Sequence, residues 1–267
     1  MPRDVQSELR RVSPRLGAFA HRVHWLPTAG STNDVASHLA ELGADEGTTV
    51  IAEAQTSGRG RHGRVWFSPA GAGLYVSVIL RLSSDHPLSG NDNPIALLTL
   101  ASGVGIAEGV RAATGLPAEI KWPNDVMIGR RKLAGILAEG AVHQGVLQFI
   151  ILGFGVNLQP AAYPADLASR ATSIEAESGR PADRAMILGE ILASVAERYG
   201  ALRAGRFDAI LSAWRRLAPS LSSARVEWDS PDGVRRGLVD GIDDQGALLV
   251  RVGGRIERLI AGEIRWL

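Results

Sequence analysis

The segment with the densest chemistry is residues 58–64, GRGRHGR, which holds three glycines, three arginines and one histidine. Glycine lets a backbone fold closely over a ligand and expose its N–H groups. Arginine supplies a planar, permanently charged group that matches phosphate or carboxylate. Two interpretations of this composition stay open: a solvated basic loop that attracts nucleic acid, or an ordered loop built around an anion.

Four other segments place polar side chains at turns or at the ends of elements. STN at 31–33 presents two hydroxyls and an amide at a helix start, where simple capping also accounts for them. KWPND at 121–125 is a well-made proline turn, and RKLAGILAE at 131–139 has a lysine at the start of an apolar strand. GFGVN at 153–157 ends a buried strand with an asparagine. Each segment taken alone is compatible with a purely structural role.

The composition excludes several classes of function. The chain has 267 residues, 29 basic and 28 acidic, so it lacks the basic excess that is typical of a general nucleic-acid binder. It has no cysteine, which excludes disulfides, thiolate catalysis and cysteine-bound metals. No GxxxxGK[ST] motif is present. The GVGIAEG run at 103–109 lies inside a helical pattern, so we assign it to helix packing rather than to dinucleotide binding.

The same considerations bear on localisation. The first twenty residues lack the apolar core of a signal peptide. We expect no run of the apolar length needed to span a membrane. We therefore expect a cytoplasmic protein without a membrane partner.

The elements that must position these segments follow from hydrophobic periodicity. Residues 1–22 form an N-terminal arm, either a short helix or disordered. The GRGRHGR run connects two strands. Two short strands are expected within 119–140. The other expected elements are a helix at 31–44, strands at 48–55 and 73–82, a helix at 93–115, a buried strand at 145–158, and helices around 187–202 and 207–217.

The pattern of apolar and polar residues changes after about residue 220. Short alternating runs are separated by turn signals such as SPDG at 230–233 and GG at 253–254. This pattern predicts a small all-β domain, a compact barrel, at 221–267. We expect an α+β fold in which a mixed-sheet domain at 23–220 precedes it.

The order of the motifs is more specific than any one of them. STN, QTSGRGRHGR, KWPND, RKLAGIL and GFGVN follow one another over roughly residues 24–160, and in this order and spacing the chain resembles the biotin protein ligase family. The resemblance implies a catalytic domain of the biotin/lipoate ligase type with a small SH3-like C-terminal barrel. It also implies a reaction in two steps. Biotin and ATP form biotinyl-5′-AMP, and the biotinyl group then passes to one lysine of a biotin carboxyl carrier protein domain.

The resemblance also implies roles for individual residues. Lys132 would bridge the biotin carboxyl group and the α-phosphate as the main catalytic residue, assisted by Arg61. Asp125 is the tentative ligand of Mg²⁺, and Lys121 would support phosphate or only the turn. The expected biotin-binding residues are Ser31, Thr32, Asn33, Gln55, Arg59, Gly60, Arg61 and Lys132. The expected nucleotide-binding residues are Arg61, Arg64, Trp66, Asn124 and Asn157.

Two departures from the family pattern qualify the resemblance. His62 stands where the family commonly has arginine, and histidine carries less charge near neutral pH. We expect a modest effect, because Arg59, Arg61 and Arg64 remain. Some family members carry an N-terminal DNA-binding domain, and only about 22 residues precede the catalytic motifs here. We therefore expect a ligase without a DNA partner, either a monomer or a homodimer formed by pairing of sheet edges.

Two rival functions remain. A lipoate–protein ligase would carry out the same acyl-adenylate chemistry on the same fold, although the combination of GRGRxGR and KLAGIL favours biotin. A non-enzymatic nucleic-acid module would use the Gly/Arg loop itself. The absence of aromatic residues within GRGRHGR, where stacking would be useful, counts against that module.

Overall fold

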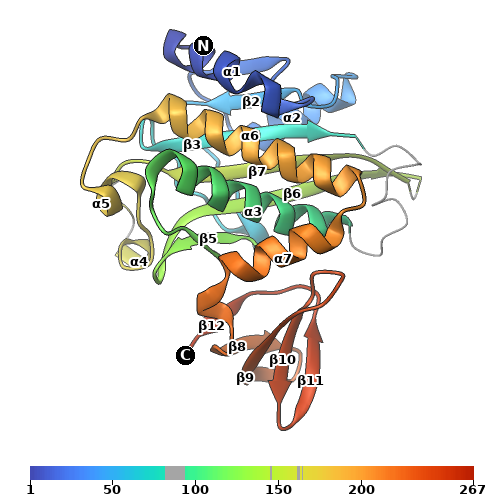
Figure 1. Ribbon diagram of the computed structural model, residues 1–267. Coiled ribbons are helices and arrows are strands. Elements are labelled where there is room, and N and C mark those ends of the chain that lie inside the picture. Colours follow the sequence, from blue (N-terminus) through green and yellow to red (C-terminus); the bar gives the residue numbers. More distant parts are fainter. Residues whose placement is uncertain (82–93, 145, 161–162, 164) are drawn as a thin grey trace.

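The computed structural model describes residues 1–81, 94–144, 146–160, 163 and 165–267 (Figure 1). Its helices are α1 (Arg3–Leu16), α2 (Thr32–Glu41), α3 (Pro94–Thr114), α4 (Ala165–Ala168), α5 (Ile174–Ser178), α6 (Arg184–Arg203) and α7 (Phe207–Leu217). Its strands are β1 (Val23–Leu26), β2 (Thr49–Ala52), β3 (Gly73–Leu80), β4 (Glu119–Lys121), β5 (Asp125–Ile128), β6 (Arg131–His143), β7 (Val146–Asn157), β8 (Arg225–Ser230), β9 (Gly233–Ile242), β10 (Leu248–Val252), β11 (Arg255–Leu259) and β12 (Ile264–Trp266).

Seven strands form a mixed sheet in the order β1-β2-β3-β7-β6-β5-β4. β1 runs parallel to β2, and every other neighbouring pair is antiparallel. Every residue of β3 is buried, as expected for a central strand covered on both faces. The predicted α+β fold with a mixed sheet is confirmed.

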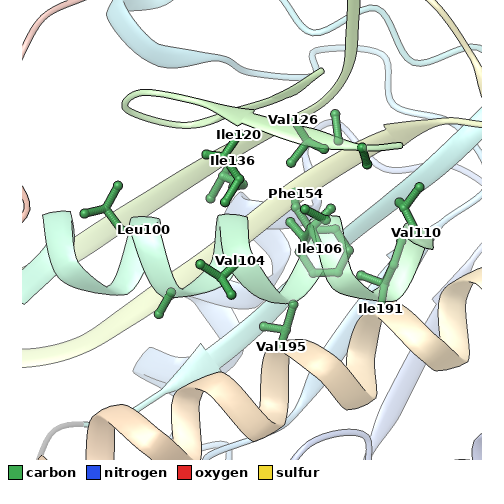
Figure 2. Packing of buried hydrophobic residues seen from close by; sticks show 14 of the residues in the cluster. Leu100, Val104, Ile106, Val110, Ile120, Val126, Ile136, Phe154, Ile191 and Val195 are labelled. Carbon is green, nitrogen blue, oxygen red and sulfur yellow. The ribbon is translucent and has the colours of Figure 1, made fainter. Parts of the chain in front are cut away.

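Helices α3 and α6 cover one face of the sheet (Figure 1). Figure 2 shows Ile106 of α3 close to Phe154 of β7, and Val195 of α6 on the other side of α3. A Cβ atom on Gly105 would lie 2.7 Å from the Cα of Val195, and one on Gly109 would lie 2.5 Å from the Cα of Ile191. These glycines therefore allow the two helices to pack closely, which confirms that GVGIAEG serves helix packing.

The structure corrects three expectations. Residues 119–140 form three strands rather than two, because KWPND closes a hairpin between β4 and β5. The short strand β1 was not predicted. By length and composition α3 is able to cross a membrane, so the expectation that no run reaches that length is wrong. In this structure α3 is a core helix packed between the sheet and α6, with 67% of its apolar window buried.

The N-terminal arm, left open between a helix and disorder, contains helix α1. Its buried residues recur at helical spacing, as Val5, Leu9, Val12 and Leu16, and α1 packs against α6. Ion pairs reinforce the contact: Arg15 Nη1 lies 2.7 Å from Glu190 Oε2.

Strands β8–β12 form a second, antiparallel sheet in the order β11-β10-β9-β8-β12, which confirms the predicted C-terminal β domain. It lies beyond α7 in Figure 1. Trp122 Nε1 donates a hydrogen bond of 3.1 Å to the Gly246 carbonyl and so ties the two sheets together. The boundaries at residues 22 and 220 stay a prediction.

Candidate active site

A buried polar cluster surrounds the start of α2. Thr32 donates to Gln55 Oε1 through both its backbone N–H (2.8 Å) and its hydroxyl (3.1 Å). Ser77 Oγ, from β3, lies 2.8 Å from Thr32 Oγ1 and 2.6 Å from Asn33 Oδ1. Ser31 is the N-cap residue, and its side chain makes no capping hydrogen bond. The STN segment therefore presents fixed donors and acceptors to the sheet rather than only capping the helix.

Glycines in β6 and β7 form a floor without side chains next to this cluster. Gly135 and Gly155 are register partners, and the Trp66 indole lies over both. A Cβ atom at Gly155 would come within 2.3 Å of Trp66 Nε1. A Cβ atom at Gly153 would come within 2.1 Å of Asn33 Oδ1. The floor is thus shaped to let large or polar groups approach the backbone.

The GRGRHGR segment is an ordered loop. The backbone N–H of Trp66 donates to the Gly58 carbonyl (2.9 Å), and the backbone N–H of Gly60 donates to the Arg64 carbonyl (2.7 Å). The chain reverses at a turn in which His62 has φ 57° and Gly63 has φ 73°. Of the two interpretations of this segment, the structure favours an ordered loop over a solvated basic loop.

The three arginines of the loop have different partners. Arg59 Nη2 lies 2.7 Å from Asp34 Oδ1 and 2.9 Å from Glu139 Oε2, at the edge of a cavity of about 240 Å³. Arg61 Nη1 donates to Asn124 Oδ1 at 3.3 Å, and burial lowers its pKa. Arg64 Nη2 lies 2.5 Å from an oxygen of Glu263.

Lys132 lies at the other end of the glycine floor. Its Nζ is 2.5 Å from Asp125 Oδ1 and 5.4 Å from the centre of the Trp66 ring. The backbone of Lys132 is fixed on both sides, because its N–H donates to the Arg170 carbonyl and its carbonyl accepts from Thr172 N–H. Lys132 and Arg61 therefore converge on adjacent residues, Asp125 and Asn124.

Comparison with known proteins shows the family of the chain. The model of the biotin/lipoate A/B protein ligase family matches residues 25–157, and that of the biotin protein ligase C terminal domain matches residues 225–265. The biotin–[acetyl-CoA-carboxylase] ligase of Mycobacterium tuberculosis is 35% identical over 88% of this chain and 85% of its own length. The corresponding ligase of Paracoccus denitrificans is 33% identical, over 85% and 92%.

The chain belongs to the biotin protein ligase family. Its structure is also similar to the biotin protein ligase from Aquifex aeolicus in complex with biotin and ATP, with a TM-score of 0.78 and 27% identity. That likeness covers 92% of this chain and 99% of the other. The bifunctional ligase/repressor BirA of Bacillus subtilis is 35% identical over 88% of this chain and 70% of its own length.

Not every residue expected at the ligase site has its side chain free for a ligand. Asn157 is buried, and its Nδ2 donates to the Thr172 carbonyl at 2.9 Å. Asn124 Nδ2 donates to the Ile136 carbonyl at 2.9 Å. Lys121 stacks over Trp266, 5.3 Å from the ring centre, and burial lowers its pKa. The two asparagines fix backbone around Lys132, and their contact with adenine stays a prediction.

Sequence reasoning missed four polar residues that contact the expected site residues. Ser68 links Gln55 to the loop, and Glu139 accepts a 2.6 Å hydrogen bond from Asn33 Nδ2. A signal existed for Ser77, a lone polar residue in an apolar strand, and for Glu139, which follows an apolar run. Glu263 gave no signal, because its contact with Arg64 joins segments about 200 residues apart.

Proposed function

We propose that this chain carries out biotin ligation with the residues that converge on the glycine floor. The protein activates biotin with ATP and transfers it to a lysine of a biotin carboxyl carrier protein domain. The observation that carries the assignment of residues is the convergence of Arg61 and Lys132 on Asn124 and Asp125. Two cations brought together from separate segments suit a reaction between two anions.

Biotin would lie along the floor with its ring system at the polar cluster. Thr32, Asn33 and Gln55 supply paired donors and acceptors for a ureido group, with Ser31 beside them. Arg59 and the backbone at Gly60 would close over the ring from the loop. The carboxylate would then point toward Arg61 and Lys132 at the other end of the floor.

In the first step a biotin carboxylate oxygen attacks the α-phosphorus of ATP. An oxygen–phosphorus bond forms, the bond to the β-phosphate breaks, and pyrophosphate leaves with the electron pair. Lys132 would stabilise the negative charge that develops at the α-phosphate, while Arg61 and Arg64 bind the phosphates. Trp66, Asn124 and Asn157 would surround the adenosine.

Mg²⁺ would bind at this site only together with ATP. No group of three or more histidine or acidic side chains is placed to hold a metal within the part of the chain that the structure describes. Mg²⁺ usually keeps several waters and binds through one or two carboxylates together with substrate phosphates. Asp125 is the carboxylate that we assign to it; when bound, the ion would neutralise phosphate charge.

In the second step the neutral amine of the carrier lysine attacks the acyl carbon. An amide bond forms, the bond between the acyl carbon and the phosphate oxygen breaks, and AMP leaves with its electron pair. The amine releases one proton to solvent. Until that step the anhydride must be kept from water, and the ordered loop at 58–66 would cover it. The cytoplasmic location, the oligomeric state and the absence of a DNA partner stay predictions.

The test is to incubate the protein with ATP, Mg²⁺, biotin and a biotin carboxyl carrier domain. Mass spectrometry should show a biotin-sized gain on one carrier lysine. Controls omit ATP, replace that lysine with arginine, or supply lipoate instead of biotin. A gain with lipoate but not with biotin would make the chain a lipoate ligase, and no gain with either would overturn the proposal.

A further inference from the structure

The turn before β12 brings the C-terminal domain into contact with the GRGRHGR loop. Arg61 Nη1 donates to the Gly262 carbonyl at 3.4 Å. The next residue, Glu263, forms the ion pair of 2.5 Å with Arg64. Both loop residues are ones to which we assign the phosphates of ATP, so the C-terminal domain already supplies oxygen atoms to the phosphate-binding groups.

The charges around Glu263 are mainly positive. The hydrogen bond from Arg64 holds the pKa of this carboxyl below its ordinary value, and Lys121 and Lys132 lower it further. The carboxylate of Glu263 also acts on Arg61, where it opposes the effect of burial. A single carboxylate therefore interacts with four basic residues, three of which we place at the adenylation chemistry.

The chain directly after Glu263 is fixed within the C-terminal domain. The neighbouring Ile264 pairs with Trp228 of β8, and Arg265 forms ion pairs with Glu227 and Asp229. The Glu263 side chain is 35% exposed and that of Arg64 is 64% exposed. An exposed ion pair of this kind is weak, so a polyanion with more charge is able to replace it.

We propose that Glu263 competes with the phosphates of ATP for Arg64, and that ATP binds by displacing this carboxylate from Arg64. The inference rests on the proposed function, because it takes Arg64 as a phosphate-binding residue. The carboxylate keeps the loop paired with the C-terminal domain until nucleotide arrives. The ligands that compete with it are oligophosphates, namely ATP and pyrophosphate, and biotin is not among them.

The decisive variant is Glu263→Gln, which removes the charge and keeps the size of the side chain. The matched control is Glu257→Gln, since Glu257 forms an ion pair with Arg235 in the same sheet, away from the loop. Calorimetry measures the binding of ATP, inorganic pyrophosphate and biotin to the full chain. Steady-state assays of adenylation give the KM for ATP and for biotin.

We expect Glu263→Gln to tighten the binding of ATP and pyrophosphate by about two- to fivefold, the range for loss of one partly exposed ionic competitor. The KM for ATP should fall while the KM for biotin stays unchanged. Glu257→Gln should change neither. In an Arg64→Gln background, the Glu263→Gln substitution should have a smaller effect on ATP binding than in the wild-type protein, because the ion pair between the two residues is already absent.

Equal or weaker ATP binding by Glu263→Gln would overturn the inference, because the carboxylate would then position the loop rather than compete with phosphate. So would an equal change in the KM values for ATP and biotin, which indicates a structural role. If the wild-type protein forms biotinyl-5′-AMP and Glu263→Gln gives either of these two overturning results, only this inference is refuted. If the wild-type protein binds ATP but forms no biotinyl-5′-AMP, only the proposed function is refuted.

Discussion

At the scale of single residues, Lys132 bears most directly on the chemistry. Its Nζ is already ion-paired with Asp125 and lies against Trp66, and its backbone is fixed on both sides. We predict that Lys132→Ala slows formation of biotinyl-5′-AMP by ~10²–10³, the cost of losing one preorganised donor to a developing negative charge. Single-turnover assays with biotin and ATP measure this rate.

The matched control for Lys132 is its neighbour Arg131, whose exposed side chain pairs with Glu177 at 2.7 Å. Arg131→Ala should leave the rate of adenylation unchanged, because successive side chains of a strand point to opposite faces of the sheet. Circular dichroism should show that both variants fold. A normal rate in Lys132→Ala would show that the lysine serves only to neutralise Asp125.

Arg61 has a different predicted role. Its guanidinium is half-buried and contacts Asn124 and Gly262, so it is placed where both domains and the loop meet. We predict that Arg61→Ala weakens retention of biotinyl-5′-AMP by about ten- to a hundredfold, as for loss of a charge-assisted hydrogen bond. The affinity for free biotin should change much less. Equilibrium binding of both ligands tests this, and equal losses would mean that Arg61 only shapes the loop.

The sequence allowed these residues to be singled out because the order of the motifs resembles that of the biotin protein ligase family, whereas each motif alone is compatible with a structural role. Lys132 does lie next to Asp125, and Arg61 contacts the adjacent Asn124. The sequence could not reveal which side chains are already engaged. Asn157 and Asn124 are bonded to backbone carbonyls, which depends on the folded positions of Thr172 and Ile136. Glu263 was missed because a carboxylate in a β domain has no periodic signature.

At the scale of elements, hydrophobic periodicity was sufficient for three helices of the catalytic domain and insufficient for two short strands of its sheet. The helices α3, α6 and α7 span three or more turns, so their apolar positions repeat and could be predicted. β1 and β4 have four and three residues, too few for an alternation to be visible. Their place in the sheet is set by register with β2 and β5 rather than by their own residues.

The glycine floor allows a test at the element scale. We predict that Gly153→Ala lowers the free energy of unfolding by about 1–3 kcal/mol, the usual cost of overpacking. The added methyl group would meet Asn33 Oδ1, which Ser77 and Glu139 hold in place through the Asn33 amide. Biotin binding should weaken with it, because Asn33 moves. Urea unfolding and calorimetry measure the two effects.

Gly200 of α6 provides the control, since a Cβ atom there would meet nothing within 4 Å. Gly200→Ala should leave biotin binding unchanged and stabilise the helix by up to about 1 kcal/mol through higher helix propensity. If Gly153→Ala behaved like Gly200→Ala, the close approach of Asn33 to β7 would have no consequence for the site.

At the scale of the whole molecule, the two sheets meet at a few defined contacts. One is the turn at 261–263 beside the loop, and another is the β9–β10 turn, where Gly246 approaches Leu100 and accepts from Trp122. The sequence predicted a mixed-sheet domain and a C-terminal β domain, but no pattern in either domain predicts which residues contact the other domain. The docking of the domains therefore had to come from the structure.

The docking contact at Trp122 gives the last prediction. Trp122→Phe removes the buried indole N–H and leaves the Gly246 carbonyl without this donor, at a cost of about 1–3 kcal/mol. Hydrogen exchange should accelerate in the turn at 243–247 while the amides of β7 keep their protection, because the loss is local to the domain contact.

Trp214→Phe is the control, since the Trp214 indole nitrogen is buried and has no hydrogen-bond partner among the described residues. It loses ring volume but no such bond, so exchange at 243–247 should not change. Equal acceleration in both variants would mean that the domains are held together by apolar packing rather than by this hydrogen bond.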